Sequence, residues 1–372
     1  MRILAIDIGT GTQDILLFDS AVEPENCFKM VMPSPTAILA AQVRRATAAG
    51  QSLVLTGVTM GGGPVAWAVD EHLKRGLAVY ATVDAARTFN DDLTQVRAMG
   101  VHLIGEDEAM QLARRHTQIR LRDLDLDAVA AALRAFDIEP RYDALAIAVL
   151  DHGNAPPDVS DRVFRFNHIR SVVEKAAGQG DQLLAFAYMP GDLPPYLTRM
   201  QAIVRSVGDV GVPLVLLDTG AAAALGALED REVARHNDVV LLNLGNMHVL
   251  ATHLVDGRIV GLFEHHTGFL TAEKLDRYLD ALIAGNLRNE TIFDDMGHGS
   301  YIVEPPAIAA HTPMTFLSVT GPRRALARSS SFHPYFAVPH GDMMITGCFG
   351  LVRACAARLP EWNEEIARAL GA

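Results

Sequence analysis

Short apolar runs separated by glycine turns mark the start of the chain. Residues 3–8 and 15–18 are rich in Ile, Leu and Phe and flank Gly9-Thr10-Gly11-Thr12, which predicts two strands joined by a tight turn. A third extended run covers residues 28–32, and helical spacing follows over residues 37–48. Strand and helix patterns then alternate as far as residues 144–150. Such alternation is typical of a mostly parallel sheet with helices on its faces.

The second half of the chain repeats this pattern of predicted strands and helices. Residues 183–188 and 213–217 have strand patterns, and residues 238–252 again give a strand, a glycine turn and a strand. The hairpins near residues 7 and 243 are therefore candidate equivalents in an internal duplication. We expect two related lobes, over residues 1–160 and 161–372, joined by a packed hinge near residues 155–185.

Composition and charge exclude several classes of protein. A chain of 372 residues, 49% hydrophobic and 20% charged, suits two globular domains with a sizeable core. A net charge of -12 without a basic run argues against a nucleic-acid partner. The longest apolar stretch, residues 212–228, is interrupted by Asp218 and Gly220 and is too short to span a membrane.

The cysteines and the start of the chain indicate a cytoplasmic protein. Residues 1–4 enter a strand pattern at once, without a leader or cleavage site. Cys27, Cys348 and Cys355 are an odd number and suit reduced, buried thiols better than disulfides. They form neither a three-cysteine cluster nor a C-x-x-C pair, so no iron–sulfur cluster is expected.

The first glycine turn does not have the pattern of a dinucleotide-binding turn. That motif needs a third glycine and a helix directly after the turn. Here Asp14 stands at the third position, and residues 15–19 continue as a strand. A Walker loop is absent from the sequence. The glycines therefore lie in a hairpin.

Such a hairpin turn can bind phosphate. Backbone amides at Gly9 and Gly11 can approach an anion closely, and Thr10 and Thr12 add hydroxyl donors. Asp7, at the end of the strand, would hold a hydrated magnesium ion beside the phosphates. The alternative is an ordinary β-hairpin whose glycines serve only the turn.

The segment from Asp7 to Asp14 resembles the first phosphate motif of the actin, sugar-kinase and 70-kDa heat-shock chaperone superfamily. Residues 243–248, with Asn243, Gly245 and Asn246, lie where its second phosphate motif would be, and residues 219–226 are similar to its small-residue connecting helix. Turns at Gly321 and Gly347 resemble its nucleoside-binding turn. The resemblance implies a two-lobed α/β fold of the duplicated ribonuclease H-like type, with mixed sheets flanked by helices, that binds ATP or ADP with Mg²⁺.

Asn243 departs from the pattern of that superfamily. Its catalytically active members begin the second motif with an aspartate that helps to hold the metal. An amide binds magnesium more weakly than a carboxylate and cannot accept a proton. The departure weighs against nucleotide hydrolysis but not against nucleotide binding.

The strings Glu264-His265-His266-Thr267-Gly268 and Asp295-Met296-Gly297-His298-Gly299 resemble, more narrowly, an uncharacterised prokaryotic family. Its members are labelled as related to pyruvate formate-lyase activating enzyme. That label implies radical chemistry on an iron–sulfur cluster, and such a cluster needs a trio of cysteines that this chain lacks.

Further polar residues are candidates for the site. Asp151 follows the strand at residues 145–150, where it would act as a general base or, alternatively, cap a turn. Gly62 and Gly63 end another strand, in a turn that either approaches a ligand or only redirects the chain. Arg323 would clamp an anion or simply solvate the surface.

The histidines form a second candidate group. His248, His265 and His266 lie on the second hairpin unit, and His298 follows it. Of this cluster, His265, His266 and His298 could bind a metal or an anionic substrate, and the alternative is a structural role. Because adjacent side chains of a strand point to opposite faces, His265 and His266 reach one site only if the chain bends.

Three hypotheses for the function follow. The leading one is an ATPase or small-molecule kinase that binds a purine nucleotide and magnesium between its lobes, with Asp7 at the metal and Asp151 as the base. The second is a catalytically degenerate ligand-binding or accessory protein, and the third is a metal- or anion-dependent enzyme that uses the histidine group. The expected partner is a small molecule, and a homodimer is a candidate assembly.

Overall fold

The computed structural model describes residues 1–178, 180–304 and 315–371. Its first sheet has six strands in the order β3-β2-β1-β8-β10-β9. The first three form an antiparallel meander, and β8 and β10 run parallel to β1. Runs of Ile, Leu and Ala bury β1 and β8 on both faces, as expected for central strands. The strands are β1 (Arg2–Ile8), β2 (Thr12–Asp19), β3 (Phe28–Pro33), β8 (Ala144–Val149), β9 (Ala187–Tyr188) and β10 (Leu214–Asp218).

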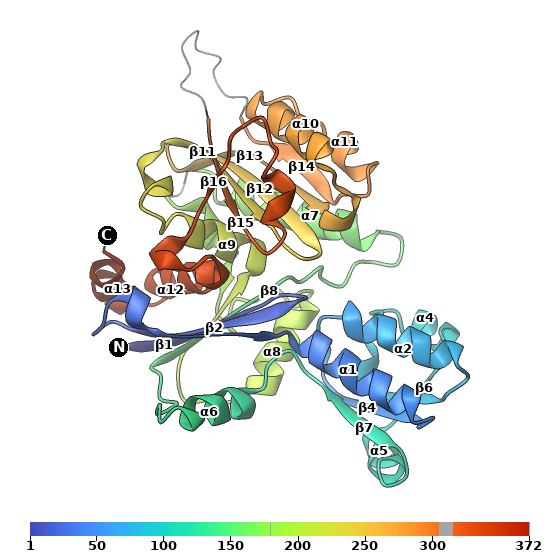
Figure 1. The fold of residues 1–372 in the computed structure, drawn as a ribbon. Coiled ribbons are helices and arrows are strands. Elements are labelled where there is room, and N and C mark those ends of the chain that lie inside the picture. Colours follow the sequence, from blue (N-terminus) through green and yellow to red (C-terminus); the bar gives the residue numbers. More distant parts are fainter. Residues whose placement is uncertain (179, 305–314, 372) are drawn as a thin grey trace.

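The second sheet repeats this arrangement in the order β14-β13-β12-β11-β15-β16. Again the first strand of an antiparallel meander, β11, pairs on its other side with a parallel strand, β15. The chain thus has the two-lobed, duplicated ribonuclease H-like architecture of actin-like ATPases that the sequence predicted (Figure 1). The strands are β11 (Asp238–Leu244), β12 (His248–Val255), β13 (Arg258–His266), β14 (Gly299–Ile302), β15 (Phe316–Thr320) and β16 (Tyr335–Phe336).

An inserted subdomain lies between β3 and β8 in the sequence. Its sheet has four parallel strands in the order β6-β5-β4-β7, and it encloses a separate core with helices on its faces. Figure 1 shows this subdomain beside the first sheet, in blue to cyan. The mostly parallel sheet expected from the sequence is therefore this one, because the two large sheets are mixed. The elements are α1 (Pro35–Ala48), β4 (Leu53–Gly57), α2 (Pro64–Lys74), β5 (Val79–Thr82), α3 (Val83–Ala86), α4 (Leu93–Ala98), β6 (Val101–Ile104), α5 (Glu106–Leu112) and β7 (Thr117–Leu121).

The boundary between the lobes differs from the one predicted. Strands β9 and β10 hydrogen-bond within the first sheet, and the second sheet begins at Asp238. The chain therefore passes from one sheet to the other between Asp218 and Asp238 and not at residue 160. The boundary does not lie at the hinge expected near residues 155–185. The sequence pattern did not show that later strands return to the first sheet.

Two helices cross tightly between the sheets. These are α9 (Thr219–Ala227), the predicted small-residue helix, and α12 (Thr346–Arg358). A Cβ atom on Gly226 would lie 1.8 Å from the Thr346 carbonyl oxygen, and one on Gly350 would lie 2.0 Å from that of Ala222. Glycine is therefore required on both helices for this close approach.

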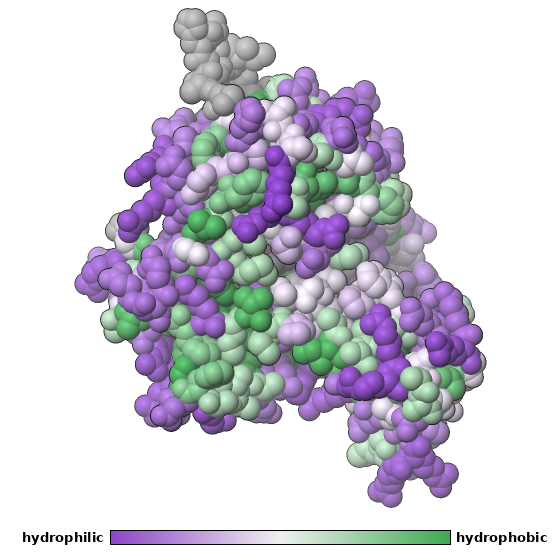
Figure 2. Space-filling model, viewed as in Figure 1, coloured by the Kyte–Doolittle hydropathy of each residue, from purple (hydrophilic) through white to green (hydrophobic). Residues whose placement is uncertain are grey.

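Most of the remaining helices cover the outer faces of the two large sheets, whereas α7 (Asp161–Lys175) and α13 (Asn363–Leu370) share the core between the sheets with α9 and α12. The two C-terminal helices, α12 and α13, lie beside the first sheet (Figure 1). There the Met1 amino group is 2.9 Å from Glu365 Oε1 of α13. Among the described helices, none has both the length and the apolar character of a transmembrane segment. Figure 2 shows a pale surface of intermediate hydropathy where the second lobe, at the top of the view, meets the inserted subdomain. These helices are α6 (Leu126–Ala135), α7 (Asp161–Lys175), α8 (Thr198–Val207), α10 (Ala272–Ile283), α11 (Asn289–Phe293) and α13 (Asn363–Leu370).

Candidate functional site

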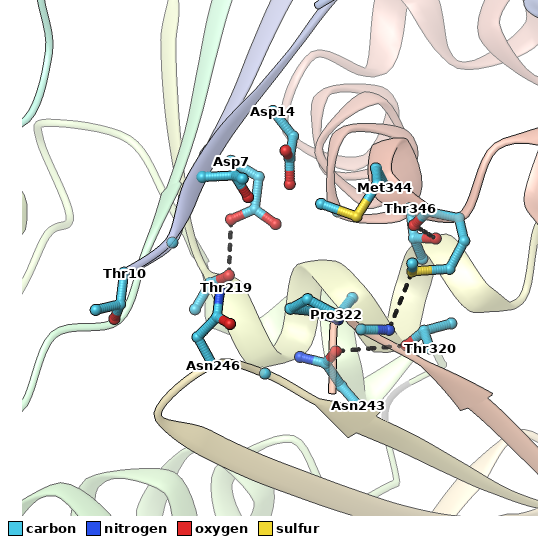
Figure 3. Close-up of a pocket in the computed structure, with 17 residues that line it drawn as sticks. Asp7, Thr10, Asp14, Thr219, Asn243, Asn246, Thr320, Pro322, Met344 and Thr346 are labelled. Atoms are coloured by element: carbon cyan, nitrogen blue, oxygen red, sulfur yellow. Dashed lines mark hydrogen bonds between the residues drawn. The ribbon is translucent and has the colours of Figure 1, made fainter. Parts of the chain in front are cut away.

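Two glycine turns, one from each large sheet, face each other across a pocket (Figure 3). In the β1–β2 turn, Gly9 N donates to the Thr12 carbonyl at 2.9 Å. In the β11–β12 turn, Gly245 N donates to the His248 carbonyl at the same distance of 2.9 Å. The two hairpins are thus built alike, and Asp7 and Asn243 occupy equivalent positions two residues before these glycines.

The pocket brings together most of the residues that the resemblance assigned to nucleotide binding. Gly11 lies outside its lining but touches the opposite turn, since a Cβ atom there would lie 2.3 Å from Asn246 Nδ2. The cavity measures only about 90 Å³, below the 300–1,000 Å³ typical of ligand pockets, so the two turns are closed against each other. The predicted residues that line it are Asp7, Gly9, Thr10, Thr12, Asn243, Gly245, Asn246, Gly321 and Gly347.

The Asp7 carboxylate points into this pocket from the end of β1 (Figure 3). Its Oδ1 accepts a hydrogen bond from Thr219 Oγ1 at 2.7 Å, at the start of α9. Its Oδ2 fills the space beside Gly347, where a Cβ atom would lie 2.0 Å away. Burial raises the pKa of Asp7 to about 7. The free carboxylate is therefore electrostatically unsatisfied and suited to a cation.

Asp14 supplies a second carboxylate that the sequence analysis did not assign to the site. It lies directly opposite Asp7 in the β1–β2 register and points into the same pocket (Figure 3). Burial and the neighbouring Asp7 raise the pKa of Asp14 to about 8, and its Oδ1 has no hydrogen-bond partner within the described residues. The pairing of residues across the predicted hairpin would have revealed this partner.

The Asn243 side chain lies against Thr320 and Gly321 of the second lobe. Thr320 Oγ1 donates to its Oδ1 at 3.5 Å (Figure 3). A Cβ atom on Gly321, whose φ is +95°, would lie 2.7 Å from the same oxygen. The two carboxylates of the pocket therefore both belong to the first hairpin, and the second hairpin contributes neutral groups.

A larger cleft adjoins the pocket and shares Gly9 and Thr10 with it. Its volume is about 1010 Å³, enough for a small organic ligand. Gly62 and Gly63 line it as predicted, and Gly63, with φ +51°, leads into α2. A Cβ atom on Gly63 would lie 3.3 Å from Thr10 Cγ2, which places this turn beside the phosphate loop.

Asp151 lies at the edge of the cleft, but both its oxygens are engaged. Oδ1 accepts from Gly153 N at 2.8 Å, and Oδ2 accepts from Met200 N at 2.9 Å near the start of α8. Burial raises the pKa of Asp151 to about 6, and these amides oppose the shift. The two hydrogen bonds favour the capping role over that of a general base.

The histidine group differs from the predicted one. His265 points away from the cleft, where its ring stacks on Tyr278, 5.9 Å between centroids. His266 and His298 lie together, with ring centroids 4.6 Å apart. They meet His248, which belonged to the predicted cluster, and His152, which did not. The opposite orientation of the two adjacent histidines follows from the alternation of side chains along β13.

Two arginines hold carboxylates beside the cleft, the buried Arg165 and the partly exposed Arg199, which lines it. Arg165 of α7, 1% exposed, binds Asp218 at 2.8 Å and Glu264 through its Nε, also at 2.8 Å. Arg199 of α8 binds Asp123 at 2.7 Å, and Asp123 in turn accepts from Gly61 N at 3.2 Å. Nothing in the local sequence pattern marked these pairs, because their partners are distant in the chain.

The predicted anion clamp at Arg323 is not part of either cavity. Its side chain is exposed, whereas its backbone N donates to the Leu244 carbonyl at 2.9 Å and its carbonyl accepts from Leu326 N at 2.9 Å. The turn that carries it contributes Gly321 and Pro322 to the pocket instead. The solvated alternative for Arg323 is therefore the one that the structure shows.

Solved structures of several proteins are similar to this chain at low identity. Ethanolamine utilization protein EutJ from Carboxydothermus hydrogenoformans is 12% identical, with 94% of this chain and 89% of that chain covered and a TM-score of 0.34. A ROK family transcriptional regulator, a homolog of the E. coli MLC protein, is 9% identical (69% and 37% covered, TM-score 0.23). The nucleotide-free structure of an acetone carboxylase is 12% identical (70% and 45% covered, TM-score 0.22). The strand order of the two sheets, and not these distant likenesses, identifies the fold.

Comparison of the sequence with curated proteins gives no match. A family model matches residues 60–326, which is more than half of the chain and includes the glycine turn of the second lobe and the four clustered histidines. Its description is "Putative pyruvate format-lyase activating enzyme (DUF1786)". The chain belongs to this family.

Proposed function

We propose that this protein binds a purine nucleotide together with Mg²⁺ in the pocket between the two glycine turns, and that it acts as an ATPase or small-molecule kinase. The observation that carries the proposal is the pairing of two equivalent hairpins, one from each sheet, around two buried carboxylates. Backbone amides of such turns bind phosphate oxygens. The preference for a purine comes from the resemblance of the loops.

The residues of the pocket fit a magnesium ion. Asp7 and Asp14 are hard oxygen ligands on one hairpin, and Asp14 Oδ1 is buried without a partner in the described part of the chain. Both would hold the ion directly or through water. Magnesium bound here would neutralise charge on the phosphates and supply electrostatic stabilisation to phosphoryl transfer.

The chain's own groups have separate tasks in this proposal. Thr219 holds the Asp7 carboxylate through its hydroxyl, and the turns at Gly9 and Gly245 present amides to phosphate. Pro322, Met343 and Met344 give the pocket an apolar wall against which a base can pack. The adjoining cleft would admit a second substrate beside Thr10, which both cavities share.

A second candidate function is nucleotide binding without turnover. Asn243 favours it, because the second hairpin brings no carboxylate to the pocket. The engagement of Asp151 with two backbone amides points the same way, since a capping carboxylate is a poor proton acceptor.

The description of the family suggests different chemistry, which the cysteines do not fit. Cys348 Sγ lies 3.1 Å from the Asp14 carbonyl oxygen inside the core. Cys355 follows two turns later on α12, about 10 Å further along the axis. Both thiols are fully buried, and burial raises the pKa of Cys355 to about 12. No step of the proposed function runs through an iron–sulfur cluster.

The proposal is tested by calorimetric titration of the protein with ATP and with ADP, with and without Mg²⁺. We expect binding that magnesium strengthens, and a loss of at least about tenfold in Asp7→Asn. Asp19→Asn, at the far end of the same hairpin, is the matched control and should bind as the wild type does.

Phosphate release and transfer then separate the two candidates. Binding with release, or with transfer to an acceptor, supports the enzyme, and binding alone supports the non-hydrolysing alternative. If neither nucleotide binds at millimolar concentration, the nucleotide-binding proposal is wrong.

A further inference from the structure

Three histidines from both sides of the large cleft converge on one point. His152 follows β8 of the first lobe, whereas His248 begins β12 and His298 precedes β14 in the second lobe. One ring nitrogen of each lies within 4.8 Å of the corresponding nitrogens of the other two. The ring centroids are 5.1–5.4 Å apart. The three imidazoles come from three distant segments, so the fold and not a local sequence pattern brings them together.

We propose that His152, His248 and His298 form a binding site for a divalent transition metal of the zinc class, with its remaining coordination position open to the cleft. This site is separate from the carboxylate pair of the nucleotide pocket, and it does not depend on nucleotide binding. Imidazole nitrogens suit zinc, cobalt and iron, whereas the oxygen ligands of Asp7 and Asp14 suit magnesium.

The spacing of one pair of nitrogens fits tetrahedral coordination, and the third nitrogen lies within 4.8 Å of both. His152 Nε2 and His298 Nε2 are 3.2 Å apart. Two nitrogens bound to zinc at about 2.0–2.1 Å in a tetrahedron would be about 3.3 Å apart. A hydrogen bond between the His152 and His298 rings would have a similar length. It would not explain why the third ring, that of His248, lies beside them. His248 Nε2 is buried and has no hydrogen-bond partner within the described residues, which a shared metal ion would remedy.

A carboxylate lies behind His298, as is common in zinc sites. The Nδ1 of His298 is 3.6 Å from Glu264 Oε2, which is beyond hydrogen-bonding distance, and it has no hydrogen-bond partner in the described residues. The Nε2 of His298 faces His152. Arg165 holds Glu264 and Asp218, so one positive charge is balanced by two negative ones beside the histidines.

The fourth position faces the cleft beside His266. The Nδ1–H of His266 donates to the Met296 carbonyl at 2.6 Å. Its ring lies 5.0 Å from that of His248 and lines the cleft. Three protein ligands with an open position are typical of a zinc site that binds a water molecule or substrate oxygen.

The test is metal titration of the full chain, prepared without a polyhistidine tag, stripped with a chelator and kept in excess Mg²⁺ to occupy oxygen sites. We expect one equivalent of Co²⁺ to bind with a tetrahedral absorption spectrum and to be displaced by Zn²⁺. His248→Gln and His298→Gln should each weaken binding by at least about 100-fold. His265→Gln is the matched control, on the opposite face of β13, and should bind as the wild type does.

A metal that binds equally well to His248→Gln and His298→Gln, or no binding at micromolar Co²⁺ and Zn²⁺, would overturn the proposal. Because a glutamine variant can misfold, X-ray absorption of the wild-type zinc complex provides a measurement that needs no variant. Scattering from about three imidazoles supports the site. A shell of oxygen ligands alone contradicts it.

Discussion

At the scale of single residues, Asp7 and Asp14 determine what the pocket can bind. The two carboxylates face each other across one hairpin, and burial together with their mutual repulsion raises the pKa of Asp14 to about 8. In the ligand-free protein the pair must therefore share a proton or accept a cation. A divalent ion relieves the burial of both charges at once.

Asp14→Asn should weaken the binding of Mg²⁺–nucleotide by at least about tenfold while leaving the fold intact, because the amide removes the buried charge but keeps the shape. Calorimetric titration at pH 8 measures the first effect, and thermal melting of the ligand-free protein measures the second. Unchanged affinity for Mg²⁺–nucleotide in this variant would contradict a metal role for Asp14.

Arg165→Met should lower the free energy of unfolding by about 3–5 kcal/mol, because it leaves Asp218 and Glu264 buried without their partner. Arg170→Met on the same helix is the control, since Arg170 makes an exposed pair with Glu174 and should matter little. Urea denaturation of both variants measures the difference. Equal urea midpoints for the two variants would show that Arg165 does not hold the carboxylates together.

His72 should make the inserted subdomain sensitive to acid. It is fully buried, its Nδ1 lies 2.8 Å from Thr47 Oγ1, and burial lowers its pKa below the usual 6.5. The unfolded chain then binds a proton more readily than the folded one, so stability is lost as the pH falls below about 6.5, by up to about 1.4 kcal/mol per pH unit.

His72→Gln should flatten this dependence, and the exposed His102→Gln should keep it. The measurement is the urea midpoint at several values between pH 7 and pH 5. A slope that survives in His72→Gln would assign the acid sensitivity to other groups.

At the scale of elements, hairpins were the features that the sequence predicted best. The turns at Gly9 and Gly245 are local, and their apolar flanks predict the strands on either side. The inserted four-stranded sheet and the return of β9 and β10 to the first sheet depend on contacts between distant segments. Periodicity does not report such contacts, so the predicted boundary at residue 160 was wrong.

The site followed the same rule. Residues within the glycine turns were predicted to meet, and most of them line one pocket, with Gly11 just outside its lining. Asp14 and His152 were missed as site residues because their roles arise from pairing across strands and between lobes. His265 was included because it neighbours His266, although alternation along the strand turns it away.

The crossing of α9 and α12 leads to a prediction at this scale. Gly350→Ala should destabilise the protein by about 1–3 kcal/mol through overpacking, because the new Cβ would meet the Ala222 carbonyl. This loss should appear even though alanine favours a helix by about 1 kcal/mol over glycine. Gly191→Ala, where no atom lies within 4 Å of the added Cβ, is the control, and urea midpoints of both variants provide the measurement. Equal midpoints would show that the crossing can relax.

At the scale of the whole molecule, α12 joins parts of the chain that are far apart in the sequence. Phe349, Leu351 and Val352 on this helix share one core with Ile3 and Ala146 of the first sheet. Its first turn lies at the pocket, where Gly347 touches Asp7. The same helix therefore contacts the pocket at one end and packs between the lobes along its length.

The contact between Gly11 and Asn246 has a kinetic consequence. With the two turns touching and a cavity of only about 90 Å³, a nucleotide can enter only after the hairpins separate. At high nucleotide concentration the observed association rate in stopped-flow mixing should therefore level off at the rate of opening, instead of rising in proportion. Asn246→Gly should raise that plateau by removing the side chain that meets Gly11. A rate that stays linear in nucleotide concentration would show that the ligand enters without such a gate.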